Sequence, residues 1–410
     1  MKKQLAYALA VSLLSLTGLR PAQAAESKAA GLEFSGNVDI VTGWQHDDGS
    51  TFDGPAPGVG GSCAFGPGGL GCNAVDTAGS GSGQLGDFRG LAVPNRDTFN
   101  FYVDQVELDL QKTFGENIRI RADLDFGRFL SGSGRTTQAG SNFNLEQGYI
   151  TTNIPVGKGM ELLLGRFNAP IGLESVDRVD NVALSYSNLY RYLRPQNVTG
   201  TKLYYAFNDN LDWSLYLVNN LQDVFGGAVG TDSAIPSWGT RLGFTWGGEG
   251  KENTIGLSYA GGPEAFGNNA HLTHILDLDF NLYLGQRFNL GGEFLYRQDN
   301  VTSAFPPGTP NSKGLAGFLL LNFIANQTWN IYFRYDYIHD INPTGAYTGL
   351  DQQIHDFSIG AGYQITDGAQ LKFEYRLDLH NYSAAVAAAL TGGDRSAISN
   401  ALAVEFAYNF

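Results

Sequence analysis

Apolar and charged side chains alternate strictly in many short stretches of this chain. In NIRIRADLDF, residues 117–126, aliphatic and aromatic side chains share one parity, while Arg119, Arg121, Asp123 and Asp125 share the other. LKFEYRLDL at 371–379 and ILDLDFNL at 275–282 split in the same way. A period of two residues is typical of a β-strand with two different faces. Strands of this kind put charge where a soluble barrel or sandwich would have its core.

Sixteen segments follow this rule, and short connections alternate with long ones along the chain. Bacterial outer-membrane barrels show this pattern, with short turns in the periplasm and long loops outside. In hydrocarbon a closed sheet pairs every backbone N–H and C=O. We therefore predict an all-β fold, a transmembrane antiparallel β-barrel of about 16 strands, with about 14 to 18 allowed by uncertain boundaries. The predicted strands are 32–46, 98–113, 116–130, 142–153, 159–167, 198–207, 211–220, 237–246, 252–261, 271–283, 287–298, 313–324, 328–339, 353–364, 369–379 and 396–410.

The last predicted strand, 396–410, ends on an aromatic residue in an apolar row that contains Phe406, Tyr408 and Phe410. We expect it to pair with 32–46 and close the barrel, with its apolar row facing outer-membrane lipid. A terminal aromatic strand of this form resembles the signal that the outer-membrane assembly machinery reads. The resemblance implies that the machinery is a partner through the strand ending at Phe410.

The N-terminus resembles an export signal. Lys2 and Lys3 precede an apolar stretch, and Ala22-Gln23-Ala24 fits a cleavage site, so residues 1–24 are predicted to be a signal peptide and 25–410 the barrel. Removing Lys2, Lys3 and Arg20 lowers the formal charge from −14 to −17. Nucleic acid, which needs a basic surface, is not an expected partner.

A long connection, 47–97, is predicted to be an extracellular loop. It contains both cysteines of the chain, Cys63 and Cys72, in SCAFGPGGLGC. In an exported protein we expect them to form a local disulfide.

One internal stretch, beginning LLLGRFNAPIG at 162–172, is more specific than the alternation. It contains a G-[KR]-F-x-x-P-I-G element, a tyrosine-rich segment, Thr199-Gly200 and a later Val218-Asn219. These features resemble the β-barrel porins of the OmpL-like group. The resemblance implies a diffusion channel in the bacterial outer membrane, and barrels of this size in related families imply a trimer.

A barrel of about 16 strands leaves an aqueous lumen filtered by inward side chains. Acidic residues outnumber basic ones on the inward parity, which predicts a modest preference for cations. Pairing of these charges across strands is the alternative. The predicted pore-lining residues are Glu107, Asp109, Arg119, Arg121, Asp123, Asp125, Asp277, Asp279, Arg297, Arg334, Lys372, Glu374, Arg376 and Asp378.

The connection 168–197 follows the fifth predicted strand. In general porins the loop at this position folds into the lumen, so by resemblance 168–197 is the candidate constriction loop; an ordinary extracellular loop is the alternative. Its charged residues, mixed with tyrosines, could create a transverse field. These residues are Glu174, Asp177, Arg178, Asp180, Arg191 and Arg194.

Other functions have weaker support. The six histidines fall near predicted extracellular strand ends, and the spacing of His271 and His274 puts them on opposite faces of a strand, which disfavours a metal site. No serine or acid constellation accompanies them, so we expect no enzyme, no cofactor and no metal. A channel specific for a sugar, small acid or metal ion is the main alternative, followed by a surface adhesin that uses 47–97 and by an outer-membrane hydrolase.

Overall fold

The computed structural model describes ten stretches of the chain, which include all the strands below. The signal peptide, Cys63, Cys72 and most of the loop 47–97 lie outside the described residues, so those calls stay predictions. The described residues are 31–48, 96–115, 117–126, 143–221, 235–248, 250–264, 272–300, 311–341, 351–384 and 395–410.

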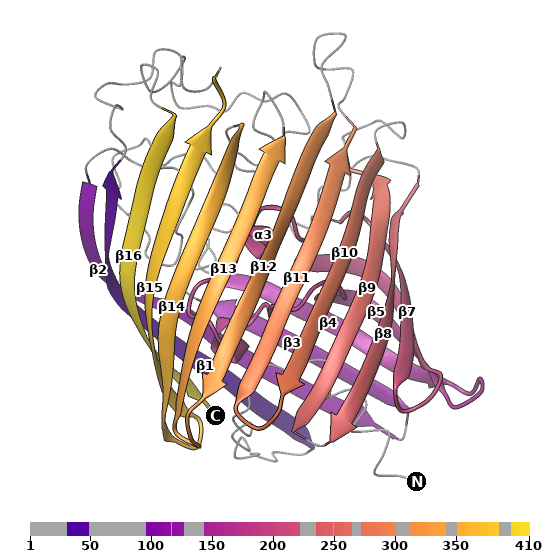
Figure 1. Cartoon of the computed structure of the whole chain (residues 1–410). Helices are drawn as coiled ribbons and strands as arrows, with labels where there is room; N and C mark the ends of the chain where they lie inside the picture. The colour runs from indigo at the N-terminus through magenta and orange to yellow at the C-terminus, as the bar shows by residue number, and fades with distance from the viewer. Residues whose placement is uncertain are drawn as a thin grey trace.

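The described residues form sixteen antiparallel strands that close into one barrel (Figure 1). Each strand pairs with its sequence neighbours, and β1 pairs with β16. The predicted fold and strand number are confirmed, with strand ends within a few residues of those predicted. The strands are β1 (Leu32–Asp48), β2 (Arg96–Phe114), β3 (Ile118–Phe126), β4 (Phe143–Ile154), β5 (Met160–Asn168), β6 (Asn197–Ala206), β7 (Leu211–Val218), β8 (Ser237–Gly248), β9 (Lys251–Pro263), β10 (Leu272–Leu284), β11 (Phe288–Asp299), β12 (Ser312–Ile324), β13 (Trp329–Ile341), β14 (Gln352–Thr366), β15 (Ala369–Tyr382) and β16 (Ser396–Asn409).

The closing seam of the barrel is the pairing of β1 with β16, as predicted. Its register runs from Asn37 opposite Asn409 to Asp48 opposite Ile398. Beyond β16, the N–H of Phe410 donates to the carbonyl of Gly36 at 3.0 Å. The backbone of the terminal residue is therefore part of the ladder.

The two faces of the strands differ as the alternation predicts. Outward residues of β16 such as Leu402 and Phe406 are 53% and 41% exposed, whereas Ala403 and Glu405 between them are buried. In an outer-membrane barrel the outward apolar row is the face that meets the membrane. Among the described residues, no helix has the length and apolar character to cross a membrane.

Besides a register shift at the end of β14, between Gln364 and Thr366, two strands depart from strict alternation through β-bulges. The register of β1 with β2 shifts between Asp39 and Ile40, which leaves Asp104 unmatched in β2. A second shift, in the pairing of β3 with β4, leaves Glu146 unmatched. A bulge places an extra residue in one strand and re-aims its side chain. Asp104 and Glu146 are both buried next to an inward-facing neighbour.

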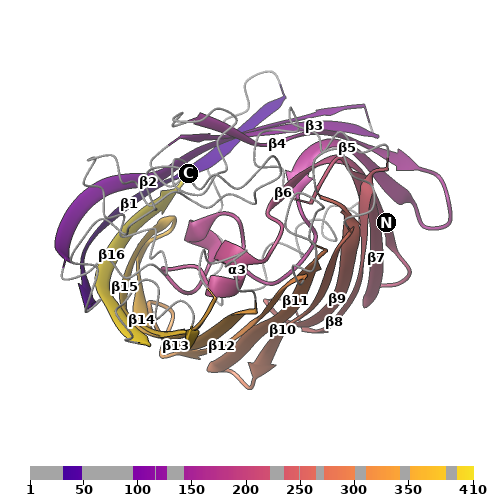
Figure 2. The same cartoon turned by 90° about the horizontal axis from the view of Figure 1, so that it is seen from above.

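The connection between β5 and β6, residues 169–196, lies inside the barrel, and we call it the inner segment. It includes a short 3₁₀ turn, η1 (Arg178–Asp180), and a helix of one and a half turns, α3 (Asn188–Tyr192). Viewed from above, α3 is surrounded by the strands (Figure 2). Ser187 caps α3 by accepting a hydrogen bond from the N–H of Tyr190.

Candidate functional site

Charged side chains of β13 and β15 hold the backbone of the inner segment. Arg334 donates to the carbonyl of Ser185 and, at 2.7 Å, to its hydroxyl. Arg376 donates to the carbonyl of Tyr186 at 2.8 Å. Glu374 accepts the N–H of Leu184 at 3.0 Å. Charged partners make such hydrogen bonds stronger than neutral ones, so this wall fixes the path of the segment.

β11 holds the beginning of the inner segment. Glu293 accepts the N–H of Leu173 at 2.7 Å and lies 3.5 Å from the guanidinium of Arg194. Gly172 lies against both side chains at a φ of +82°, and a Cβ there would meet Glu293 Oε1 at 2.3 Å. A glycine is therefore required by the close approach and by the left-handed backbone.

Apolar side chains fill the space between α3 and the inner face of strands β10 to β13, which lie across the lumen from β2–β4. Leu189 and Leu193 are completely buried in one cluster with the inward-facing residues Ile275, Leu295 and Ile338. α3 contacts β12 and β13. These contacts exclude water from that side of the segment, so burial adds to the polar ties.

Four side chains of the inner segment stack on one another. The rings of Tyr186 and Tyr190 lie 4.0 Å apart and 6° from parallel. Arg178 lies over the Tyr186 ring at 5.1 Å, and Arg194 lies over the Tyr190 ring at 4.4 Å. Cation–π contacts at both ends of a tyrosine stack link η1 to the end of α3.

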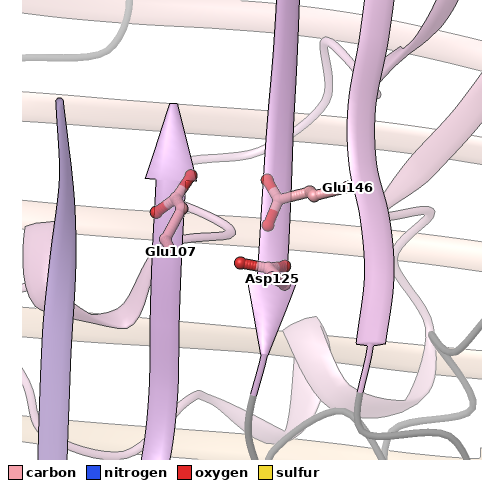
Figure 3. A group of neighbouring side chains, drawn as sticks. All are labelled: Glu107, Asp125 and Glu146. Atoms are coloured by element: carbon pink, nitrogen blue, oxygen red, sulfur yellow. The ribbon is translucent and has the colours of Figure 1, made fainter. Parts of the chain in front are cut away.

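The opposite wall, formed by β2, β3 and β4, is acidic. Carboxylate oxygens of Glu107, Asp125 and Glu146 lie within 4.8 Å of one another (Figure 3). Glu107, Asp109 and Asp123 form an overlapping group by the same measure. Gln105 donates to Asp125 at 2.9 Å, and Asn37 donates to Glu107 at 2.5 Å.

The inner segment adds two carboxyl groups to this acidic wall. Gln105 also donates to Asp177 at 3.5 Å, which places Asp177 beside Asp125. Burial, followed by Glu146 and Asp180, raises the pKa of Asp177 well above its usual value. Burial raises the pKa of Asp180 to about 6; the Lys372 ammonium opposes this shift, and Asp109 adds to it. Burial is the main cause of both pKa shifts, and neighbouring carboxylates add to it.

All the predicted pore-lining residues are on the inward parity, but only three of them, all on β2 and β3, keep a partly exposed side chain. On β3 the side chains of Arg119 and Arg121 are 23% and 24% exposed, and that of Asp109 on β2 is 19% exposed. The other predicted pore-lining residues are nearly inaccessible, because the inner segment or their neighbours cover them. These are Glu107, Asp123, Asp125, Asp277, Asp279, Arg297, Arg334, Lys372, Glu374, Arg376 and Asp378.

Of the six charged residues of the predicted constriction loop, two face the acidic wall and four make contacts that hold the segment in place. Asp177 and Asp180 face the acidic wall. Glu174 accepts the N–H of Ser187 at 3.1 Å and so stabilises the segment internally. Arg178 pairs with Asp104, Arg194 with Glu293, and Arg191 lies over the Tyr192 ring.

Two kinds of lumen residue do not follow from the alternation. Asp104 belongs to the parity that the rule assigns to lipid, and only the bulge turns it inward. Ile275, Leu295 and Ile338 have the inward parity that the rule assigns to polar residues, yet they form the core beneath α3. Apolar residues at inward positions near the outer ends of several strands were the available signal for a buried object inside the barrel.

A family model described as "Putative beta-barrel porin-2, OmpL-like" (bbp2) matches residues 75–410. The chain belongs to this family. It is an outer-membrane porin of bacteria, which confirms the predicted family, the predicted porin function and the predicted location. No curated protein matches the chain.

Solved porin structures have the same fold as this OmpL-like porin at low sequence identity. The outer membrane channel DcaP of Acinetobacter baumannii aligns with a TM-score of 0.56 and 10% identity, covering 94% of this chain and 100% of that one. An anion-selective porin from Comamonas acidovorans gives a TM-score of 0.55, 11% identity and coverages of 92% and 99%. OmpT of Vibrio cholerae, in a structure described as a trimer form, aligns with a TM-score of 0.51 and 9% identity, covering 92% of this chain and 99% of that one. Identities this low show the fold alone.

Proposed function

We propose that this porin passes small hydrophilic solutes and ions by passive diffusion, with a modest preference for cations. The observation that carries the diffusion path is the uneven exposure of the lumen charges. Arg119, Arg121 and Asp109 on β2 and β3 keep contact with solvent, while Arg334 and Arg376 on the opposite wall are 1% exposed. The permeation route then follows the side of the inner segment that faces β2–β4.

The charges on this side support the cation preference. Asp177 and Asp180 of the inner segment join the five carboxylates Glu107, Asp109, Asp123, Asp125 and Glu146 of the wall. The nearby cation Arg121 forms ion pairs with Asp123 and Asp109. Most of these carboxylates are buried, but their summed field extends into the adjacent aqueous path and concentrates counter-ions there, most strongly at low ionic strength.

The inner segment sets the narrowest section in this proposal. Its backbone is tied to β11, β13 and β15, so its position across the lumen is fixed. Asp177 and Asp180 would then act on passing ions at short range, where selectivity is decided.

The proposal is tested in a planar bilayer under a tenfold KCl gradient, with the zero-current potential and single-channel steps recorded from the refolded mature protein. Stable open steps and a potential on the cation-selective side are expected. An anion-selective potential would overturn the cation preference and leave the channel. Folded protein that gives no conductance would overturn the diffusion mechanism.

Selectivity for one solute class is the second candidate, and Arg119 with Lys202 favours it. Lys202 of β6 lies over the Phe167 ring at 5.5 Å, with Glu161 and Arg119 as its electrostatic neighbours. This local excess of positive charge could slow a carboxylate-bearing solute. Block of the KCl current by millimolar citrate, relieved in Lys202→Met, would favour specificity; an unchanged current would favour general diffusion.

We further propose that the porin has no catalytic activity, and two observations support this. Three of the four histidines with described side chains, His274, His355 and His380, hydrogen-bond Tyr259, Tyr335 and Gln352, and the fourth, His339, lies near the Tyr337 ring. These partners offer no nucleophile of the serine or cysteine type. The family is one of porins. Release of fatty acid from phospholipid vesicles by the folded protein would contradict the proposal.

We also propose that the mature chain begins after Ala24 and assembles as a trimer. The trimer form of the Vibrio cholerae OmpT structure supports the oligomeric state. N-terminal sequencing of protein from outer membranes and mass photometry in lipid nanodiscs test the two statements. The assembly machinery remains a proposed partner of the terminal strand.

A further inference from the structure

The inner segment contacts both edges of the closing seam through charged side chains. The guanidinium of Arg178 lies 2.9 Å from the carboxylate of Asp104, in the β2 bulge next to β1. On the other edge, Lys372 of β15 donates to the carbonyls of Arg178 and Val179 at 3.2 Å each. The same ammonium lies 3.0 Å from Glu405 in β16. A path of ionic contacts therefore runs from β2 through the inner segment to β16.

Arg178 supplies one of the two cations that offset the buried carboxylates at the seam. Asp39 of β1, at 0% exposure, has Glu405, Asp104, Arg178 and Lys372 as its electrostatic neighbours. All five groups are at most 3% exposed. Without Arg178, the three carboxylates would share the single cation Lys372. Buried charges that lose a partner are strongly destabilising.

An apolar contact joins the same elements. Leu184 of the inner segment is completely buried against Val41 of β1 and against Ala401 and Ala403 of β16. The alanines are inward positions of β16, and their small size leaves room for the segment. The contact between β1 and β16 is thus covered from inside by one leucine.

We propose that the inner segment locks the seam of the barrel: with Arg178 and Leu184 seated, β1 is held to β16, and with them displaced the seam opens more readily than other strand pairs. The role differs from narrowing the pore, because it concerns the strands and not the lumen. It makes Arg178 a positioning residue that connects the placement of the segment to closure of the barrel.

The test measures amide hydrogen exchange by mass spectrometry in lipid nanodiscs, with Leu184→Ala compared against Leu189→Ala. Both leucines are 0% exposed in the same segment, but Leu189 packs against the wall that contains Ile275, Leu295 and Ile338. Seam peptides covering 32–48 and 396–410 are expected to exchange about tenfold faster in Leu184→Ala and unchanged in Leu189→Ala. The hairpin of β10 and β11 serves as the internal reference in Leu184→Ala.

A second pair of variants removes one guanidinium group from the inner segment in each case. This pair decides the test if a leucine variant folds poorly. Arg178→Met removes the tie to Asp104, and Arg194→Met removes the tie to Glu293, far from the seam. Faster seam exchange in Arg178→Met alone supports the lock. Equal seam exchange in both members of either pair, or seam exchange at the wild-type rate in Leu184→Ala and Arg178→Met, would overturn it.

Discussion

The carboxylate of Glu374 accepts the backbone N–H of Leu184 at 3.0 Å and the hydroxyl of Tyr332 at 2.8 Å. The contact shows one way in which this porin holds its inner segment: side chains of the wall bind the backbone of the segment. The acidic wall on the opposite side has the reverse relation, because Asp177 and Asp180 face it with side chains. Variants of the wall residues that bind the backbone should therefore affect stability, and variants of Asp177 and Asp180 should affect ion selectivity.

Glu374→Gln should loosen the inner segment. The amide keeps the shape but loses the charge, and hydrogen bonds to charged groups are worth about 1.5–3 kcal/mol each. We expect the free energy of unfolding to fall by about 1–3 kcal/mol and single-channel current to become noisier. Glu33→Gln in β1 is the control, because Glu33 accepts from Gln111 of the neighbouring strand. Equal noise in the two variants would contradict the assignment.

Neutralising both Asp177 and Asp180 to Asn should lower the cation preference. Both carboxylates lie on the side of the segment that faces β2–β4. The zero-current potential under a KCl gradient is expected to move toward zero by several millivolts, with conductance nearly unchanged. Asp367→Asn, in the turn after β14, is the matched loss of negative charge and should leave the potential where it was. An unaltered potential in the double variant would remove these residues from the selectivity filter.

Cation preference should fall as the pH falls from 7 to 5. Asp180 titrates with a raised pKa of about 6 instead of 3.8, so it gains a proton in this range. Because the folded state binds this proton more tightly than the unfolded state, the contribution of Asp180 to stability improves as pH falls through about 6 toward 3.8. The potential is measured at several pH values in wild type and Asp180→Asn. The variant should show a smaller change; an identical pH profile would rule out Asp180 as its source.

Gly172→Ala should displace the beginning of the inner segment. The new Cβ would meet Glu293 Oε1 at 2.3 Å and the Cδ of Arg194 at 2.7 Å, at a φ of +82°. Gly285 has a similar φ of +78° with nothing within 4 Å, so Gly285→Ala carries the backbone strain alone, about 1–2 kcal/mol. We expect the thermal midpoint to fall further in Gly172→Ala, with altered conductance in that variant only. Matching thermal midpoints would show that the close approach to Glu293 is unimportant.

The alternation in the sequence predicts the barrel because, in every strand, apolar residues two apart face lipid and the residues between them face the lumen. Leu276 and Leu278 are exposed on the outer face and Asp277 between them points inward, an arrangement that a membrane barrel satisfies. Turns and loops then follow from where the alternation stops. The same logic identifies 396–410 as the closing strand.

The lumen could be predicted only in part, because parity gives the face of a side chain and not what covers it. Arg334 and Arg119 have the same inward parity, yet one is buried by the inner segment and the other meets solvent. The bulge at Asp104 leaves a trace in the sequence, because the outward apolar row changes parity between Val103 and Val106. That change does not reveal which side chain Asp104 meets. The partners of Arg178 likewise depend on three-dimensional closure of the barrel.

The inner segment is held through its backbone by hydrogen bonds from Arg334, Arg376 and Glu374. This mode of binding affects how such porins can diversify. A wall that binds the main chain tolerates an inner segment of different side-chain composition, provided that the backbone of the segment keeps the same course. The positions that face β2–β4 are then open to substitution at little cost in anchoring. One scaffold could in this way be refitted for a different solute by exchanging a handful of residues in a single connection.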